Sequence, residues 1–170
     1  MKETIQEINS MVAAGVIEQY AIGGAVGATF YVEPIATIDL DIFVSFTSSP
    51  GSGLISLSPI YSYMTGNGHS VQGEYILVNG WPVQFLAPGN ALEEEAIVAA
   101  TVTDLDGTGV RIMTAEHLAA IALRLGRPKD HARLVQFVEA GILDSGMFDE
   151  ILSRHGLVNK WKKFETRFLT

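Results

Sequence analysis

Apolar residues follow a helical period in the first segment of the chain. Between residues 3 and 16 they recur at steps of three or four and form one face: Ile5, Ile8, Val12 and Val16. This spacing predicts a helix. The apolar run 17–22 follows and ends at Gly23 and Gly24, which predicts a short strand. The alanine-rich segment 25–32 predicts a short helix that stops before Pro34.

A strand period is clearest from residue 37 to 46. One face takes the apolar side chains of Ile38, Leu40, Ile42, Val44 and Phe46, and the other takes Asp39, Asp41, Phe43 and Ser45. Because side chains alternate along a strand, both aspartates lie on the same side, with Cα atoms about 6.8 Å apart. Aspartate is depleted in strands, and a buried charge without a partner is unfavourable. The pair therefore indicates a bound cation.

The middle of the chain predicts a helix and two hairpins. Residues 54–64 predict the helix. Residues 74–78 and 81–86 are β-prone and flank Asn79-Gly80, which is a preferred pair for a two-residue turn. Pro82 suits an edge position or the start of a strand better than a central one. Residues 101–104 and 109–113 predict a second hairpin, in which Asp104-Leu105-Asp106 leads into the turn.

Helical signals dominate elsewhere. Asn90 and Glu93 resemble a capping box before a helix at 91–99. From Thr114 onward the pattern predicts successive helices, punctuated by Gly126-Arg127-Pro128 and by Asp144. The predicted fold class is α+β, a small mixed β-sheet with flanking helices and a C-terminal helical bundle. A division near residue 113 separates an α/β core, 1–113, from a helical subdomain, 114–170, with the two packed as one unit.

The amino-acid composition and net charge exclude several classes of protein. The chain has 170 residues, 48% of them hydrophobic and 18% charged, enough for a real core. A net charge of −8 argues against a surface for a long nucleic acid, although a metal ion could supply the charge that one nucleotide needs. Cysteine is absent. Because the chain shows no signal-peptide pattern and no apolar run as long as a membrane span, we expect a cytoplasmic protein without membrane contact.

Two motifs carry a family resemblance. Ile22-Gly23-Gly24, a gap of 14 residues, and then Asp39-Leu40-Asp41 in an apolar strand resemble the signature of the nucleotidyltransferase superfamily. The chain resembles the small bacterial members of toxin–antitoxin and abortive-infection type. Those proteins often show Arg-x-Thr before the paired acids and Lys-Asp in the helical tail. Here Thr37 is present without the arginine, and the tail carries Lys129-Asp130.

The resemblance implies roles for these residues. Gly23 and Gly24 would form a phosphate-binding turn, because backbone N–H groups can approach an anion where side chains are missing. Asp39 and Asp41 would hold Mg²⁺, and Thr37 and Lys129 would contact a nucleoside triphosphate.

A third acid of the family falls at Gln84. Glutamine cannot act as a base, but its carbonyl oxygen can bind. Glu74, predicted on the partner strand of the same hairpin, is a candidate substitute.

Two functions from different classes remain open. The first is Mg²⁺-dependent transfer of a nucleoside monophosphate from a nucleoside triphosphate to a hydroxyl of an unidentified acceptor, which could be a protein, an RNA end or a small molecule. The alternative is a catalytically degenerate module that binds a nucleotide or a partner protein, such as a toxin–antitoxin component, and Gln84 motivates it. A phosphohydrolase with an aspartyl nucleophile ranks last, because Phe43 stands where that chemistry predicts threonine.

Other polar residues carry less information. The four histidines show no metal-ligand spacing on a common helix face, so we interpret them as surface or partly buried residues. Lys129 and Arg133 lie four apart on one predicted helix, where they could either reach a triphosphate or be solvated.

Overall fold

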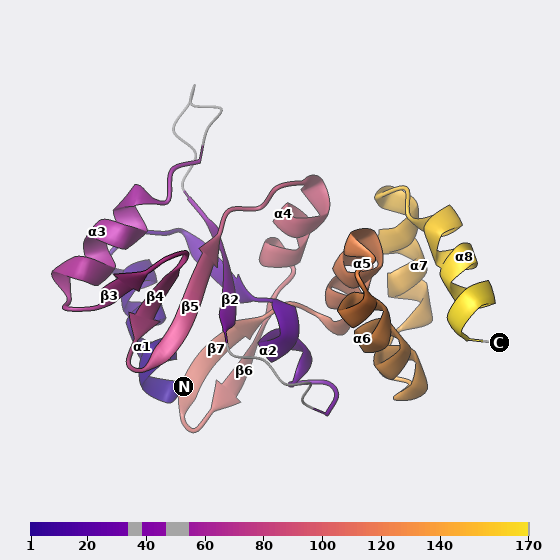
Figure 1. Cartoon of the computed structure of the whole chain (residues 1–170), viewed down its shortest axis with the longest axis horizontal. Helices are drawn as coiled ribbons and strands as arrows, with labels where there is room; N and C mark the ends of the chain where they lie inside the picture. Colours follow the sequence, from indigo (N-terminus) through magenta and orange to yellow (C-terminus); the bar gives the residue numbers. More distant parts are fainter. Residues whose placement is uncertain (34–38, 47–54, 170) are drawn as a thin grey trace.

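A computed structural model describes residues 1–33, 39–46 and 55–169. In this part of the chain seven strands form one mixed sheet of order β3-β4-β5-β2-β1-β7-β6, with helices on both faces (Figure 1). The strands are β1 (Gln19–Ile22), β2 (Leu40–Ser45), β3 (Ser70–Gln72), β4 (Tyr75–Val78), β5 (Trp81–Leu86), β6 (Thr101–Leu105) and β7 (Thr108–Ile112). The helices are α1 (Lys2–Ala13), α2 (Gly24–Ala28), α3 (Ser58–Gly66), α4 (Ala91–Val98), α5 (Ala115–Leu125), α6 (Pro128–Glu139), α7 (Ser145–Arg154) and α8 (Val158–Phe168).

Strands β5, β2 and β1 form the middle of the sheet. β2 runs antiparallel to β1 and parallel to β5, and β1 runs parallel to β7. The hairpins β4–β5 and β6–β7 extend the sheet on either side, and β3 pairs with the free edge of β4. In the β2–β5 register Asp41 lies opposite Gln84.

The alternation predicted for β2 is confirmed over its described residues. Leu40, Ile42 and Val44 are fully buried, whereas Asp41 and Phe43 are partly exposed on the other face. The buried side chains belong to one hydrophobic core with α1 and α3. α4 packs against β1 and β2, and its apolar residues join the core formed by α5 to α8.

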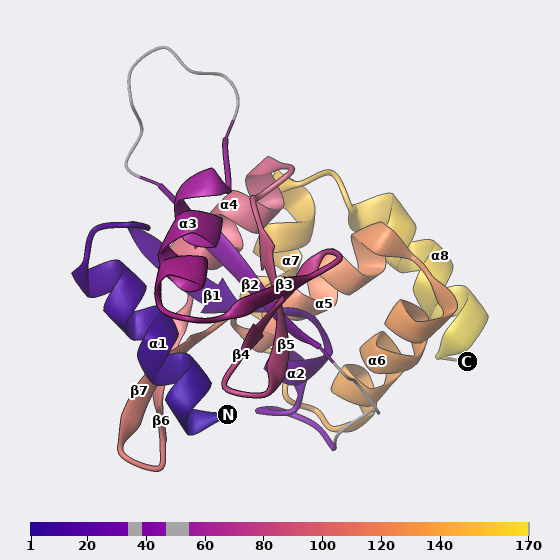
Figure 2. The ribbon, with the colours of Figure 1, turned by 60° about the vertical axis from the view of Figure 1, so that its left-hand side comes forward.

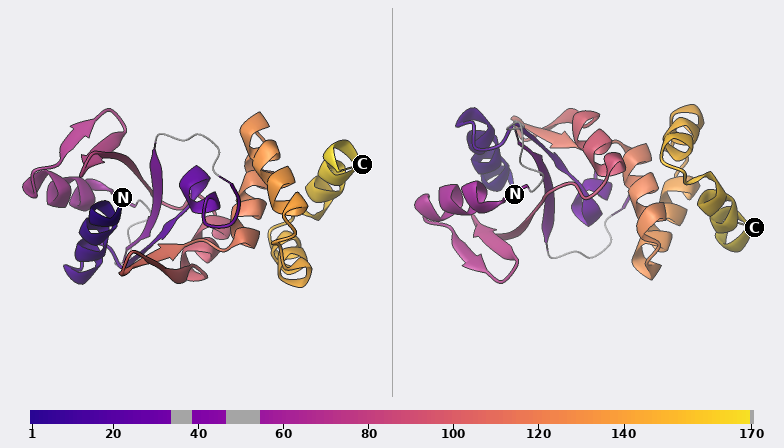
Figure 3. Two further views of the ribbon diagram at one scale, coloured as in Figure 1. Left: turned by 90° about the horizontal axis from the view of Figure 1, so that it is seen from below. Right: turned by 90° about the horizontal axis from the view of Figure 1, so that it is seen from above.

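The C-terminal helices gather at one end of the molecule, and α1 and α3 lie at the other (Figures 2 and 3). Thr114 caps α5 and Asp144 caps α7 through side-chain hydrogen bonds, and Gly126 ends α5 in the left-handed region at φ +67°. α5 contacts α6, α7 and α8, and Leu134 and Phe137 of α6 are fully buried. The structure therefore confirms the predicted α+β class, a mixed sheet followed by a helical bundle. The division at residue 113 stays a prediction.

Several details differ from the sequence prediction. α1 ends at Ala13, before Gly15 at φ +70°, and α3 begins only at Ser58. β3 was not predicted, because all its side chains are exposed and show no alternation. Pro82 lies near the start of β5, which is one of the two positions expected for it, although β5 is not an edge strand. Pro82 pairs only with Leu77 of β4, and pairing with β2 begins one residue later.

Turn chemistry agrees with the prediction. Asn79 and Gly80 both have positive φ, as do Asp106 and Gly107, so each pair closes its hairpin. The Asp104 carboxylate accepts a hydrogen bond from the N–H of Gly107, which identifies the second Asp-x-Asp as turn structure. No helix of the described residues is long and apolar enough to cross a bilayer.

Candidate functional site

The turn between β1 and α2 lies directly against the Asp41 carboxylate. The N–H of Gly23 donates to the Asp41 carbonyl at 3.0 Å, and Gly24 has φ +58°. A Cβ atom on Gly24 would overlap the Asp41 carboxylate, with Cγ only 2.8 Å away. A Cβ atom on Gly23 would lie 2.7 Å from the Phe43 ring. Both glycines are therefore required by the close approach of β2 to the turn.

A row of polar side chains continues from Asp41 across the neighbouring strands. Gln84 lies next to Asp41 in the β2–β5 register, and its Nε2 donates to Glu74 Oε2 at 3.2 Å. Glu74 lies in the β3–β4 turn, immediately before β4, and not on the strand where we predicted it. The row thus joins three segments that are separate in the sequence.

These residues line a cleft of about 840 Å³ between the sheet and the C-terminal helices. Its acidic wall carries Asp39, Asp41, Glu74 and Glu93. Its apolar wall comes from α5, through Leu118, Ile121 and Leu125. The third wall is cationic and comes from the start of α6, through Arg127, Lys129 and Arg133.

Arg127 is fixed at the start of α6 by Asp130. Its Nε and Nη2 donate to the two carboxylate oxygens at 2.6 and 3.1 Å, and its backbone N–H donates to Oδ2 at 3.1 Å. Asp130 is fully buried. Burial raises the pKa of Asp130, but the hydrogen bonds and charge of Arg127 outweigh it and hold the pKa below its usual value. This pairing leaves Asp130 without a free charge to offer a ligand.

Arg133 lies further along α6 and is only 9% exposed. Its Nε is buried and has no hydrogen-bond partner among the described residues. Burial lowers the pKa of this guanidinium, and the charges of Asp130 and Asp41 counteract the effect. Because Arg133 lines the cleft, its guanidinium is suited to donate a charge-assisted hydrogen bond to an anionic oxygen of a ligand there.

The electrostatics of Asp41 complement that wall. Burial, and then the negative charge of Asp39, raises the pKa of the Asp41 carboxyl to about 6. The positive charges of Lys129, Arg133 and Arg127 act in the opposite direction. Asp41 on β2 and Asp39, the residue just before β2, thus repel each other in the metal-free protein, and a cation bound between them would relieve that repulsion.

The available donors fit a partly hydrated Mg²⁺. The carboxylates of Asp39 and Asp41 and the carbonyl of Gln84 are oxygen ligands, which Mg²⁺ prefers. Within the described ranges, no group of three His, Cys, Asp or Glu residues is placed to hold a metal ion. Mg²⁺ in nucleotide sites commonly uses one or two carboxylates and completes its shell with phosphate oxygens and water. The residues therefore fit that mode of binding better than an all-protein cage.

The structure brings most, but not all, of the predicted site residues together in the cleft. Gly24, Asp39, Asp41, Gln84 and Lys129 all line the cleft. Gly23 supports the turn from behind, against Phe43. Thr37 lies outside the described residues.

Sequence reasoning missed Arg127 and Glu93 as cleft residues. The only sequence signal for Arg127 was Asp130 three residues later, which is the spacing of an ion pair at the start of a helix. Glu93 was assigned to a helix start, where its N–H does bond to Asn90 at 3.2 Å.

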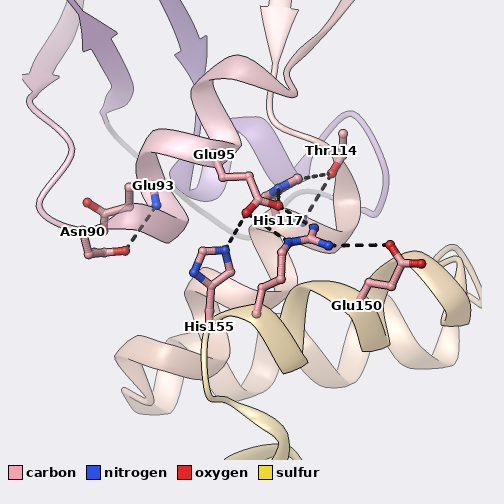
Figure 4. A network of polar contacts seen from close by, with 8 residues as sticks. Asn90, Glu93, Glu95, Thr114, His117, Glu150 and His155 are labelled. Carbon is pink, nitrogen blue, oxygen red and sulfur yellow. Dashed lines mark hydrogen bonds and ion pairs between the residues drawn. The ribbon is translucent and has the colours of Figure 1, made fainter.

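A second polar network ties α4 to the helical bundle (Figure 4). Glu95 Oε1 lies 3.2 Å from His117 Nε2 and accepts from Arg154 Nη2 at 2.7 Å, while Oε2 lies 2.7 Å from His155 Nε2. Thr114 Oγ1 accepts the backbone N–H of His117 and lies 2.8 Å from its Nδ1. This arrangement fits a neutral His117 that donates to Glu95, and burial correspondingly lowers the pKa of His117. Both histidines are thus interior partners of one carboxylate.

We expect Glu95→Gln to destabilise the protein by about 1–3 kcal/mol at neutral pH, because charged hydrogen bonds are lost. Hydrogen bonding to Arg154, against burial, lowers the pKa of Glu95 from 4.5 to about 2. A lowered folded-state pKa means that this stabilisation is complete above 4.5 and is lost as the pH falls toward 2. Urea unfolding at a series of pH values should therefore show the gap between wild type and variant closing in acid. An equal gap at every pH would contradict this role of Glu95.

Comparison with known proteins identifies the fold. No protein-family model and no curated protein sequence matches the chain. Among solved structures, the chain is similar to an antigenic nucleotidyltransferase-like protein from Paracoccidioides brasiliensis, with 13% identity and a TM-score of 0.58 over 95% of this chain and 91% of that one.

It is also similar to the antibiotic-resistance factor ANT(2'')-Ia, with 14% identity and a TM-score of 0.53 over 96% of this chain and 94% of that one. Both similarities extend over nearly the whole length of each chain. The chain therefore has the nucleotidyltransferase-like fold that its glycine pair and paired aspartates predict.

Proposed function

We propose that the protein is a Mg²⁺-dependent nucleotidyltransferase that moves a nucleoside monophosphate from a nucleoside triphosphate to a hydroxyl. The observation that carries the proposal is the apposition of Asp41 and Gly24 in a cleft whose opposite wall is cationic. A triphosphate needs a metal, a backbone turn without side chains and positive groups at one place. The cleft brings together two carboxylates that would hold the metal, the glycine turn and the positive groups, and its volume of about 840 Å³ lies in the range of small-molecule sites.

Each wall of the cleft has a distinct task in this proposal. Asp39 and Asp41 would hold Mg²⁺, which when bound neutralises phosphate charge and polarises the phosphorus under attack. Lys129 and Arg133 bind oxygens of the triphosphate and orient its leaving group. The apolar α5 wall excludes water from the reacting groups, which strengthens the charge interactions around them.

A transfer experiment tests the proposal. Purified protein is incubated with cell extract, Mg²⁺ and a mixture of ATP, GTP, CTP and UTP labelled on the α-phosphate. We expect label to appear on an acceptor, and to disappear in the Asp39→Asn/Asp41→Asn variant. Transfer that survives in the double variant would exclude this site.

The role of Arg133 in the cationic wall can be tested by substitution. We expect Arg133→Met to weaken binding of the Mg²⁺–nucleoside triphosphate about tenfold, because a charge-assisted hydrogen bond to phosphate is lost. Stability should not fall, because methionine fills similar space without a buried donor that lacks a partner. Arg124→Met is the matched control, since Arg124 is exposed at the end of α5 and does not line the cleft. Equal affinity in the two variants would remove Arg133 from the binding site.

A binding module without turnover is the second candidate, and Gln84 favours it. The position opposite Asp41 on β5 holds a neutral amide, which cannot accept a proton. Such a protein would bind a nucleotide or a partner protein, as a component of a toxin–antitoxin pair. It predicts nucleotide binding without label transfer.

In the first candidate the acceptor is a protein, an RNA end or a small molecule. The similarity to an antibiotic-resistance factor supports keeping small molecules among these acceptors.

A further inference from the structure

The proposed transfer needs a group that removes a proton from the acceptor hydroxyl, and the inference below rests on that proposed function. A free hydroxyl is a weak nucleophile at neutral pH, and a positioned carboxylate is one of the groups that can activate it. Gln84, next to Asp41, cannot do so. The base must therefore come from another side chain that lines the cleft.

Most carboxylates of the described cleft have other tasks. Asp39 and Asp41 are the proposed metal ligands. Asp130 is fully buried and accepts three hydrogen bonds from Arg127. Glu93 accepts the backbone N–H of Gly89 at 2.7 Å and so holds the chain that leads into α4. These interactions leave Glu74.

The position of Glu74 suits a base. It is exposed at the β3–β4 turn, so an incoming acceptor can reach it. Its Oε2 accepts a hydrogen bond from the neutral amide of Gln84 at 3.2 Å, which orients the carboxylate without neutralising its charge. Gln84 in turn lies opposite Asp41 in the sheet, so this hydrogen bond connects Glu74 to the strand that carries Asp41.

Tyr75, the residue after Glu74, also lines the cleft and is affected by both segments. Burial, the charge of Glu74 and the charge of Asp39 raise the pKa of the Tyr75 hydroxyl, in that order. The negative charges of Glu74, in the β3–β4 turn, and of Asp39, just before β2, thus both act on the hydroxyl of one residue that lines the cleft.

We propose that Glu74 is the general base of the transfer and that Gln84 is its positioning residue. Glu74 accepts the proton of the acceptor hydroxyl while the hydroxyl oxygen forms a bond to the α-phosphorus. The bond between the α-phosphorus and the oxygen that bridges to the β-phosphate breaks, and pyrophosphate leaves with that electron pair. The carboxylate that the site needs is thus supplied by a turn, two strands away from Asp41, instead of by the adjacent strand.

The test separates turnover from binding. We expect Glu74→Gln to lower kcat for label transfer from the α-labelled triphosphate mixture by about 10²- to 10⁴-fold. The KM for triphosphate and the affinity for Mn²⁺, followed by its electron paramagnetic resonance signal, should stay within about twofold, because a base that does not touch the metal contributes to neither. Glu94→Gln is the matched control, because Glu94 is exposed in the first turn of α4 and does not line the cleft.

A second variant exchanges the carboxylate and the amide between positions 74 and 84. In the variant Glu74→Gln/Gln84→Glu the hydrogen-bonded pair is kept and the carboxylate moves to the β5 side of it. We expect activity to recover at least about tenfold over Glu74→Gln, because one carboxylate is again present at the pair. A merely structural role of Glu74 would already leave kcat near wild type in Glu74→Gln, because the amide oxygen of glutamine can still accept the hydrogen bond from Gln84.

The outcomes are distinguishable. Wild-type kcat in Glu74→Gln, or a loss of Mn²⁺ and triphosphate binding in that variant, would overturn the assignment of Glu74 while leaving the proposed function in place. Absence of label transfer by the wild-type protein would overturn the proposed function itself, and the role of Glu74 with it.

Discussion

Asp41→Asn is expected to lower nucleotidyl transfer by about 10³-fold or more, because ligation and polarisation by a metal ion supply several kcal/mol of transition-state stabilisation. An asparagine keeps the size of the side chain beside the Gly24 turn, so the shape of the cleft is unchanged. The measurement is the initial rate of label transfer from the α-labelled triphosphates, together with Mn²⁺ titration of each protein.

The same substitution is expected to stabilise the metal-free protein. The pKa of Asp41 is raised from 3.8 to about 6, so the folded state binds more protons than the unfolded state in this window. The stability of the protein therefore falls as the pH rises through this window, and at neutral pH the charge of Asp41 costs about 3 kcal/mol. Asparagine removes that cost. Urea unfolding without metal should show the variant at least as stable as wild type at pH 7, with the advantage vanishing in acid.

Asp106→Asn is the control for Asp41→Asn. Asp106 belongs to the second Asp-x-Asp of the chain, but it lies in the β6–β7 turn at φ 52°, a conformation that asparagine accepts. Transfer by this variant should equal that of wild type. If Asp41→Asn retained wild-type transfer, Asp41 would not be a metal ligand of the reaction.

Gly24→Ala is expected to weaken triphosphate binding by about tenfold or more, and to destabilise the fold by about 1–2 kcal/mol. A Cβ atom would overlap the Asp41 carboxylate, and φ +58° is unfavourable for a residue with a side chain. Either the turn or the carboxylate must move, and both form the same wall of the cleft. Calorimetric titration with Mg²⁺–triphosphate and thermal unfolding measure the two effects.

Gly15→Ala is the control that separates the effect of a positive φ from the effect of the contact between Gly24 and Asp41. Gly15 has a similar φ of +70°, but a Cβ atom there would have no neighbour within 4 Å. We expect comparable destabilisation with unchanged triphosphate affinity. A Gly24→Ala protein that bound triphosphate as tightly as Gly15→Ala would show that the turn does not shape the site.

Local patterns along the chain predicted much of the fold. The alternation along β2, the Asn79-Gly80 turn and the cap at Thr114 each depend on residues a few positions apart. These signals are physical consequences of side-chain periodicity and of φ preference. The approach of the glycine turn to β2 was accessible for a different reason, because a known motif carries both parts of it.

Long-range pairings were not accessible in the same way. His155 meets Glu95 across 60 positions, and Arg154 meets the same carboxylate across 59. β3 itself has no apolar alternation, so its pairing with β4 left no trace in the hydrophobic pattern. Such contacts depend on how the elements pack, and a single sequence contains no periodic signal for them.

Isothermal titration calorimetry with each Mg²⁺–nucleoside triphosphate tests most directly whether the cleft is a metal-dependent nucleotide site. We predict saturable binding of at least one triphosphate to the wild-type protein, lost when Mg²⁺ is omitted and lost in Asp39→Asn/Asp41→Asn. Binding of none of the triphosphates, or binding that the double variant retains unchanged, would contradict the assignment.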